Sequence, residues 1–271
     1  MIEHIPFLRP KRYVTIIVVF VLSLFIYSYN ASINALTNDT IDHHAAATSN
    51  EEDLTVYQLP ERFREPTHLT PIDPAVLIEM GTESIDSAHR KGLLHIGGIL
   101  YVMDAAGKFL LMKRSSSVVT CPDTWSIVGE HSIGGEDAGN LPIRALEEEL
   151  GLDASYIGAT IKNLTEHPLY YIRKYGARNG NRIDRQLTYL WLVKLPKRQQ
   201  EIDWRLDHEV ADKKWITLEL FDHWLQADEA NDSTVNESNE EDDDGPPVGD
   251  FCHRTIRSLL RLGIARLKVI L

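Results

Sequence analysis

The part of the sequence best suited to chemistry is an acidic segment, residues 144–152, which comes after a glycine-rich segment, residues 129–136. Arg144 and Glu148 are four residues apart, so in a helix they lie one turn apart and can form an ion pair. Glu149 is the next residue on the same helix and would face the glycine-rich segment. Several carboxylates on one rigid element are the ligands that Mg²⁺ and Mn²⁺ prefer. These two segments therefore predict a divalent-cation site.

A cation site of this kind suits a diphosphate substrate. The negative charge of a diphosphate repels a nucleophile until metal ions neutralise it and activate water. An isolated acidic triplet is more often a solvated helix face. Here the glycines, Glu136, Arg144 and Gly151 stand in register. Pro142 in the first turn and Gly151 at the C-cap also define the ends of one short helix. The metal site is therefore the favoured interpretation.

The spacing of these residues resembles the Nudix box, G-x5-E-x7-R-E-U-x-E-E-x-G-U, in which U is a bulky aliphatic residue. The matching positions are Glu136, Arg144, Leu146, Glu148, Glu149, Gly151 and Leu152. The resemblance extends over about residues 85–225. It implies an α/β fold, a Nudix-type α/β/α sandwich with a mixed sheet. It also implies a hydrolase that depends on Mg²⁺ or Mn²⁺ and acts on the diphosphate bonds of a small molecule.

The resemblance also implies roles for individual residues. Glu148 and Glu149 would be the principal metal ligands, with Arg144 orienting Glu148. Glu136 would bind metal or support the loop. The remaining candidates would form the loop that faces the substrate: Gly129, Gly134, Gly135 and His131.

Two departures from the box bear on catalysis. Gly129 lies one residue too far from Glu136, and Ala145 stands where the family has a glutamate that binds metal or serves as a base. Three acids on or after the box are candidates to replace that base: Glu147, Glu166 and Glu201. The alternative from a different functional class is a catalytically inactive Nudix fold that serves as a binding module.

The flanking sequence is similar to the isopentenyl-diphosphate isomerase branch of Nudix proteins. The similar segments are residues 89–95, 110–115 and 122–126, and the residues that match metal-binding histidines are His89, His95 and His131. The isomerases, however, have a cysteine just before the last of these histidines, where Gly129 or Glu130 stands. Their later pair of metal-binding acids would fall near Gln186 and Thr188, which are not carboxylates. Isomerase-like activity is therefore the second choice.

Alternating and apolar runs predict the elements that position these residues. Strands are expected at residues 93–103, 108–113, 169–172, 187–193 and 214–216. Residues 104–107 form a turn that ends in glycine. The box helix and a short helix at residues 218–225 complete a mixed sheet between helices.

The chain divides into several predicted parts. Polar residues 30–84 are expected to form a stalk or linker, and residues 85–226 the Nudix domain. The acidic residues 227–249 are expected to be a disordered insertion. Residues 250–271 form a basic amphipathic helix. Its apolar face is expected to pack on the domain, with docking on an anionic membrane surface as the alternative.

The N-terminal sequence predicts a membrane anchor. Residues 1–12 would be cytosolic and residues 13–29 a transmembrane signal anchor, because positive residues precede the apolar run Val14–Tyr27. The run is near the ~17-residue lower limit for a span, so a cleaved signal peptide remains open. Either kind of segment would export the rest of the chain. The expected protein is a single-pass type II membrane protein of the ER or Golgi with a lumenal catalytic domain.

N-glycosylation sequons agree with export, although each is weak evidence by itself. They begin at Asn30, Asn38, Asn163, Asn231 and Asn236. The chain has two cysteines, Cys121 and Cys252, which can form one disulfide or remain two free thiols. That number excludes a disulfide-rich scaffold or a cysteine zinc cluster. The net charge of −12 argues against a nucleic-acid partner.

Overall fold

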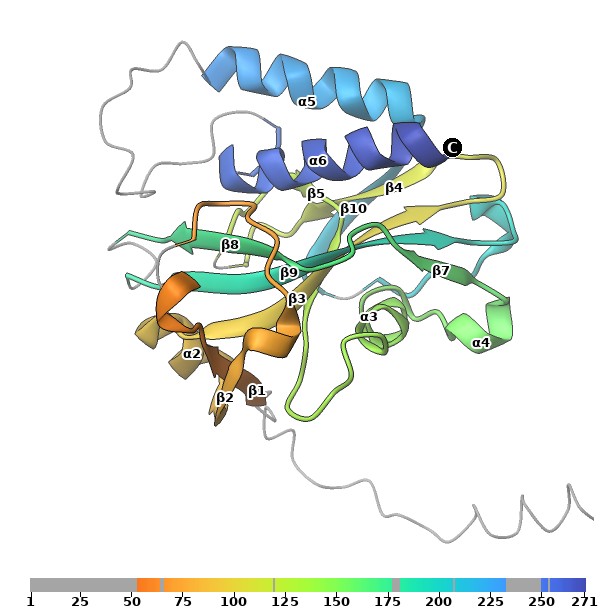
Figure 1. Cartoon of the computed structure of the whole chain (residues 1–271). Helices are drawn as coiled ribbons and strands as arrows, with labels where there is room; N and C mark the ends of the chain where they lie inside the picture. The colour runs from red at the N-terminus through yellow and green to blue at the C-terminus, as the bar shows by residue number, and fades with distance from the viewer. Residues whose placement is uncertain are drawn as a thin grey trace, which may run out of the picture. The chain divides into compact units, whose positions relative to one another are not determined.

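The computed structural model describes residues 53–271 except 64–65, 119, 177–180, 207, 233–249 and 253. Its centre is one mixed sheet (Figure 1). The strands are β1 (Asp53–Gln58), β2 (Ile78–Ser84), β3 (Leu94–Met103), β4 (Phe109–Arg114), β5 (Trp125–Ser126), β6 (Val128–His131), β7 (Thr160–Asn163), β8 (Leu169–Lys174), β9 (Ile183–Lys194) and β10 (Val210–Ile216). β3 and β9 pair in parallel, whereas β3 pairs antiparallel with β1, β4 and β6. The predicted mixed sheet is therefore confirmed.

Helices cover both faces of the sheet. They are α2 (Ile85–Lys91), α3 (Leu141–Leu150), α4 (Ala154–Ile157), α5 (Leu218–Asp232) and α6 (Arg254–Ile270), with short 3₁₀ turns η1 (Glu61–Phe63), η2 (Pro74–Val76) and η4 (Gln199–Glu201). α3 and α4 pack on one face, and α5 and α6 on the other (Figure 1). β3 serves both faces because successive residues of a strand point in opposite directions. Leu100 packs toward α3, and Tyr101 toward α6.

α3 is the box helix, and its ends agree with the sequence. Pro142 lies in its first turn, and Leu146 and Leu150 are fully buried. Gly151 ends the helix in the left-handed conformation, with φ of 64°. A residue other than glycine is strained in that conformation, so the position of Gly151 fixes where the acidic segment stops.

α6 packs on the domain, as the sequence predicted. Its apolar residues Leu259, Leu260, Ile264 and Leu267 are buried. Tyr101 donates a hydrogen bond to the carbonyl of Leu260 at 2.9 Å. Gly263 permits this approach, because a Cβ at this position would lie 2.0 Å from the tyrosine hydroxyl. Two of the basic residues of α6 pair with acids of α5, Arg261 with Glu229 and Lys268 with Asp222.

The predicted stalk is wrong for residues 53–58 and 78–84, which form β1 and β2. β1 pairs with both β2 and β3, so it belongs to the domain. Leu54 and Val56 are its buried apolar residues. β2 is an edge strand whose residues are mostly exposed. A strand without a buried face has no hydrophobic alternation, so periodicity could not reveal it.

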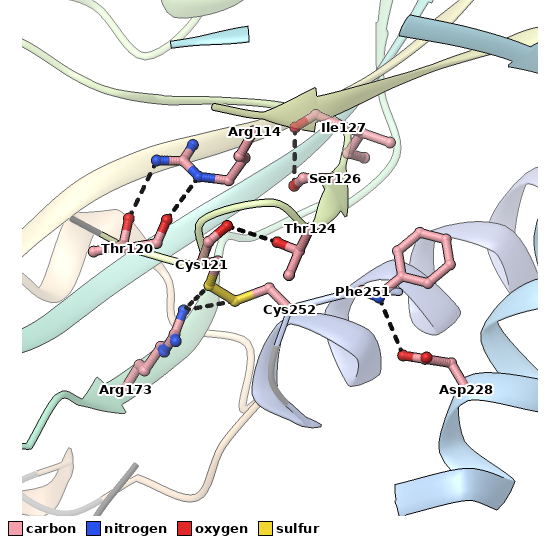
Figure 2. The surroundings of a disulfide bond; sticks show 10 residues. All are labelled: Arg114, Thr120, Cys121, Thr124, Ser126, Ile127, Arg173, Asp228, Phe251 and Cys252. Atoms are coloured by element: carbon pink, nitrogen blue, oxygen red, sulfur yellow. Dashed lines mark hydrogen bonds between the residues drawn. A yellow bond between two sulfur atoms is a disulfide. The ribbon is translucent and has the colours of Figure 1, made fainter. Parts of the chain in front are cut away.

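The predicted start of the disordered insertion is also wrong, because α5 continues to Asp232. Asp228 is 4% exposed and accepts a hydrogen bond from Arg257 Nη1 at 2.9 Å. It also accepts bonds from the backbone N–H groups of Asp250 and Phe251, the latter shown in Figure 2. These partners come 22 or more residues later in the chain, so local composition could not reveal them.

No helix in the described part of the chain is long and apolar enough to cross a membrane. The predicted span Val14–Tyr27 lies outside the described residues. Three of the sequons, at Asn30, Asn38 and Asn236, lie outside them too. Asn163 is in β7, where its side chain accepts hydrogen bonds from the N–H and the hydroxyl of Thr165. Asn231 is in α5. Glycosylation of these sites stays a prediction.

Candidate metal centre and active-site cavity

The structure brings together four metal-ligating side chains from four elements. They are His89 from α2, His95 from β3, His131 from β6 and Asp184 from β9, and together they make up the histidine–aspartate cluster. One ligand atom of each lies within 4.8 Å of the others. The three histidines are those that the sequence singled out.

Strand register explains how residues so far apart in sequence meet. β3 pairs with β9 through His95 and Gln186, and with β6 through Gly97 and His131. Asp184 lies two residues before Gln186, so its side chain points to the same face of the sheet. A cross-strand pair shares a face. Register across three strands therefore brings His95, His131 and Asp184 together, and His89 joins them from α2.

The cluster is compact, with His95 and Asp184 buried and His89 and His131 half-buried. The histidine ring centroids are 5.1–5.3 Å apart. Asp184 Oδ1 lies 3.5 Å from His95 Nε2 and 3.7 Å from His89 Nε2. His95 is 0% exposed and Asp184 7% exposed.

The hydrogen bonding of the cluster favours a bound cation. His95 Nδ1 lies 3.0 Å from the carbonyl of Leu93, and a carbonyl only accepts, so Nδ1 carries the proton. If the ring is neutral, Nε2 of His95 then carries no proton, and its lone pair faces the carboxylate of Asp184. Nε2 of His95 and Nε2 of His89 are both buried, and no described residue forms a hydrogen bond with either of them. Such orphaned groups are costly unless an ion satisfies them. Three nitrogens and one carboxylate suit a divalent transition metal such as Zn²⁺ or Mn²⁺.

The electrostatics of the cluster keep its histidines in the form that binds metal. Burial lowers the pKa of His131 to about 3, and the neighbouring His95 adds to this effect. Burial also lowers the pKa of His89. Burial alone would raise the pKa of Asp184, but the three histidines outweigh it and hold that pKa below its usual range. Neutral imidazoles and an ionised carboxylate are the protonation states of metal ligands.

Gln186 orients the cluster without being a ligand in it. Its amide nitrogen donates to Asp184 Oδ1 at 2.7 Å and lies 3.1 Å from His131 Nε2. Gly97 leaves room for this side chain, because a Cβ there would lie 2.3 Å from Gln186 Oε1. The sequence correctly indicated that Gln186 and Thr188 supply no carboxylate. It missed Asp184, which alternation would have placed on the same face had the predicted strand begun at Ile183 rather than Leu187.

Arg144 organises the Nudix-like segment. Its guanidinium binds both carboxylate oxygens of Glu136, at 3.1 and 3.2 Å, and Glu148 Oε2 at 2.6 Å. It also donates to the backbone carbonyl of His131 and lies 3.7 Å from Glu130. Burial disfavours the charge of Arg144, but the hydrogen bonds to Glu136 and the three nearby carboxylates outweigh it and raise the pKa above its ordinary value. The predicted Arg144–Glu148 pair is therefore present.

The box carboxylates differ in where they lie. Glu136 accepts from Arg144 and from the N–H of Ile133, so its contacts match the loop-supporting role of the two predicted for it. The Glu148 side chain is 46% exposed. Glu149 lines a cavity beside the histidine–aspartate cluster. Within the described ranges, these three acids form no compact ligand group like that cluster. Their role as metal ligands stays a prediction.

This cavity, of about 170 Å³, joins the two regions. Its lining includes Glu149 from α3, His131 from β6 and Asp184 from β9. The remaining carboxylates that line it are Glu130 and Glu209. The three acids predicted as substitute bases, Glu147, Glu166 and Glu201, are exposed and do not line it. Ala145 lies on the inner face of α3, where it is fully buried among apolar residues.

The glycine-rich loop contributes less to the cavity than predicted. Gly129 lines it. Gly134 donates to the carbonyl of Asp53, and Gly135, with φ of 77°, donates to Thr55 Oγ1, so both contact β1 instead. The two cysteines, whose state the sequence left open, form a disulfide (Figure 2). Both cysteines line the cavity.

Comparison with known proteins agrees with these features. The chain is 28% identical to an m7GpppN-mRNA hydrolase of Xenopus laevis over 50% of its length, covering 45% of that protein. It is also 28% identical to an isopentenyl-diphosphate Δ-isomerase of Rhodobacter capsulatus, over 49% of this chain and 69% of the relative. The chain therefore spans about half the length of the first of these relatives.

Solved structures of Nudix proteins are similar to it at low identity. One is an Ap4A hydrolase of C. elegans, at 27% identity with a TM-score of 0.32, covering 45% of this chain and 80% of that one. The family model described as the NUDIX domain matches residues 94–236, which include the box helix α3 and the strands β3, β6 and β9 that carry three of the four cluster residues. This match covers more than half of the sequence, and the chain belongs to the Nudix family.

Proposed function

We propose that this Nudix protein is a metal-dependent hydrolase that cleaves a diphosphate linkage in a small molecule of the nucleoside-diphosphate or prenyl-diphosphate type. The observation that carries the proposal is the shared cavity. Glu149 of the box lines it together with His131 and Asp184 of the histidine–aspartate cluster. A diphosphate that enters this cavity meets both candidate metal-binding regions.

The residues of the site would act by binding and by positioning. The histidine–aspartate cluster would hold one metal ion, and a bound ion would neutralise the diphosphate and lower the pKa of a water molecule. Arg144 connects Glu136 to the backbone of His131, so the box fixes the loop and the strand that carries a cluster ligand. The acids that reach the cavity, Glu149 and Glu130, are better placed to accept a proton from water than the exposed acids elsewhere on α3.

Isomerase-like activity is the second candidate, because three histidines of the cluster match the isomerase branch and one relative is an isomerase. Gly129 or Glu130 stands at the position of the isomerase cysteine, and neither residue has a thiol. Gln186 and Thr188 also stand where the isomerases have their later metal-binding acids. We therefore rank hydrolysis first.

A single screen separates these functions. The purified protein is incubated with Mg²⁺ or Mn²⁺ and nucleoside-diphosphate sugars, dinucleotides or prenyl diphosphates, and released phosphate products are measured. We expect metal-dependent hydrolysis of at least one class and no dimethylallyl diphosphate from isopentenyl diphosphate. Formation of dimethylallyl diphosphate at enzymatic rates would overturn the ranking. Binding of a diphosphate with no turnover would identify an inactive binding module.

We also propose that the catalytic domain lies in the lumen of the ER or Golgi, anchored as a type II membrane protein. The basic residues before Val14–Tyr27 support this orientation. The Cys121–Cys252 disulfide is compatible with it, since disulfides persist in oxidising compartments. In eukaryotic cells the protein should sediment with membranes and lose apparent mass when N-glycans are removed. Digestion of the domain by protease added to sealed vesicles would refute the lumenal location.

A further inference from the structure

Arg173 is a buried cation in the wall of the cavity, and the proposed chemistry does not use it. It lies on β8, is 5% exposed, and its register partner on β9 is Asp184. Cross-strand partners share one face of the sheet. Arg173 therefore lies on the cavity side, next to the carboxylate of the histidine–aspartate cluster.

The Arg173 side chain contacts the disulfide. Nη1 of Arg173 lies 2.8 Å from Sγ of Cys121 and 3.0 Å from Sγ of Cys252 (Figure 2). The guanidinium also stacks over the ring of Tyr175, 4.3 Å from its centroid. Sulfur is a weak acceptor and a ring is weaker still. The main effect of these contacts is therefore to orient the guanidinium.

Most of the charged side chains that line the cavity are carboxylates, so a cation is needed there to bind an anionic substrate. Carboxylates from β6, α3 and β9 line the cavity, and they repel an anionic substrate. Arg114 also lines it, but its side chain is 30% exposed, whereas Arg173 is buried. A guanidinium cannot lose its proton in a protein, and its planar fork matches two phosphate oxygens. Arg173 is thus suited to offset this repulsion.

The disulfide connects two segments that converge on Arg173. Cys121 lies in the loop between β4 and β5 with φ of 50°, and Cys252 lies just before α6, 131 residues later. Both cysteines are buried, at 7% and 2% exposure. The bond therefore holds the loop and the start of α6 together at the cavity wall.

We propose that Arg173 binds a phosphate oxygen of the diphosphate substrate and that the Cys121–Cys252 disulfide holds its guanidinium in place for this contact. The proposal rests on the proposed function, because it assigns a residue to the anionic part of that substrate. Arg173 is a binding residue, and the disulfide acts on the substrate through it. The affinity of the cavity for diphosphate is then sensitive to the redox state of the two cysteines.

The test measures binding of inorganic pyrophosphate to the full chain in the presence of Mn²⁺ by calorimetry. Arg173→Met should weaken binding by about tenfold or more, the scale of a lost charge-assisted hydrogen bond. The matched control is Arg185→Met on the neighbouring strand. Arg185 alternates with Asp184 and Gln186, so it points to the opposite face, and it donates to the hydroxyl of Tyr170. This control should bind pyrophosphate like the unaltered protein.

A double-mutant cycle tests the role of the disulfide. Cys121→Ser combined with Cys252→Ser should weaken pyrophosphate binding about three- to tenfold. If the disulfide acts through Arg173, adding Arg173→Met to that variant should give the same affinity as Arg173→Met alone. A phosphine reductant should reproduce the serine effect in the unaltered protein only. In that reaction, the phosphine takes the oxygen of one water, and each sulfur gains a hydrogen.

The outcomes distinguish this inference from the proposed function. If the unaltered protein binds no pyrophosphate, both are overturned. If it binds, and Arg173→Met binds equally well, only the role of Arg173 is overturned. Additive effects in the cycle would refute positioning by the disulfide. Should Arg173→Met fail to fold, Arg173→Lys keeps the charge without the fork and should give a smaller loss, and the reductant result then decides.

Discussion

The histidine–aspartate cluster and the Nudix box both carry metal-ligand chemistry, but they are held in different ways. The cluster is assembled by strand register, and its ligand atoms lie within 4.8 Å of one another. Two of its ring nitrogens are buried and have no hydrogen-bond partner among the residues that the structure describes. In the box, Arg144 engages Glu136 and Glu148. The ligands of the cluster need a cation. In the box, the guanidinium of Arg144 already neutralises Glu136 and Glu148.

This difference shows that the Nudix box can support the cavity in two ways. It can hold the strand that carries a cluster ligand, and it can supply an acid to the cavity. Arg144 reaches from α3 to the backbone of His131, so the box stabilises the strand that supplies a cluster ligand. Among the box acids that the sequence assigned to metal, Glu149 alone lines the cavity. We therefore expect the cluster to govern metal affinity, Glu149 to govern turnover, and the Arg144 network to govern stability.

The largest effect should come from the cluster. Asp184→Asn removes the only charge among its four ligands and should lower the affinity for Mn²⁺ or Zn²⁺ by ~10²-fold or more, because even outer-shell partners of metal ligands are worth 10–100-fold. Metal affinity is measured by calorimetry on the chelator-treated protein. Glu147→Gln, an exposed substitution on α3, is the control and should leave it unchanged. An equal loss from Glu148→Gln would place the tighter site in the box and reverse the comparison.

The next effect concerns turnover. Glu149→Gln keeps the shape of the side chain but removes a charge at the cavity, and it should lower metal-dependent turnover by ~10²-fold, the scale of missing electrostatic stabilisation. The rate of phosphate release is measured at saturating metal, with Glu147→Gln as the control. If Glu149→Gln turns over at the normal rate, the box supplies no group to the chemistry and serves the fold alone.

How far the sequence predicts each region depends on the range of its interactions. α3 is predicted well because its start, its buried residues and its end all lie within a dozen residues. β3 is predicted well because a strand buried on both faces is a continuous apolar run. The Arg144–Glu148 pair can be inferred from helical spacing alone. These are local patterns, and sequence periodicity records them.

The features that the sequence does not predict depend on partners distant along the chain. Asp184 joins the cluster through the register of β9 with β3, about ninety residues earlier. Asp228 is buried because Arg257 meets it from α6. The disulfide closes 131 residues. Composition near Asp228 indicates only solvated acids, and no spacing rule chooses between a bridge and two thiols. The resemblance to the isomerase branch found the three histidines but placed the carboxylate two positions too late.

A third effect is on stability and tests the box as scaffold. The side chains of Arg144 and Glu136 are 15% and 8% exposed. Arg144→Met leaves buried carboxylates without their cation and should lower the free energy of unfolding by about 3 kcal/mol. Urea unfolding measures this loss. The control is Arg90→Met, whose side chain is 64% exposed in a pair with Asp86 and should cost less than about 1 kcal/mol. Equal losses would mean that the box network is an ordinary surface feature.

The smallest effect is a pH dependence that only the cluster should show. His131 has a pKa of about 3 in the folded protein, lowered by burial, and the pKa of His89 is lowered in the same direction. An unfolded histidine titrates near 6.5, so between these values the unfolded chain binds more protons than the folded one. Stability of the metal-free protein should therefore fall as the pH drops below about 6.5. The slope should reach roughly 1.4 kcal/mol per pH unit for each histidine that stays neutral.

Urea unfolding of the chelator-treated protein from pH 7 to 4.5 measures this slope. The lowered pKa of Asp184 acts in the same direction but only below about pH 4, outside this range. Arg144 stays charged throughout, so the box contributes nothing to the slope. His131→Asn should remove the contribution of one histidine to the slope of stability against pH. His223→Asn, at an exposed position on α5, should leave the slope unchanged. An unchanged slope in His131→Asn would mean that His131 binds protons equally in the folded and the unfolded chain. Burial would then not hold this ring in the neutral, metal-binding form, and the contrast with the box would lose that support.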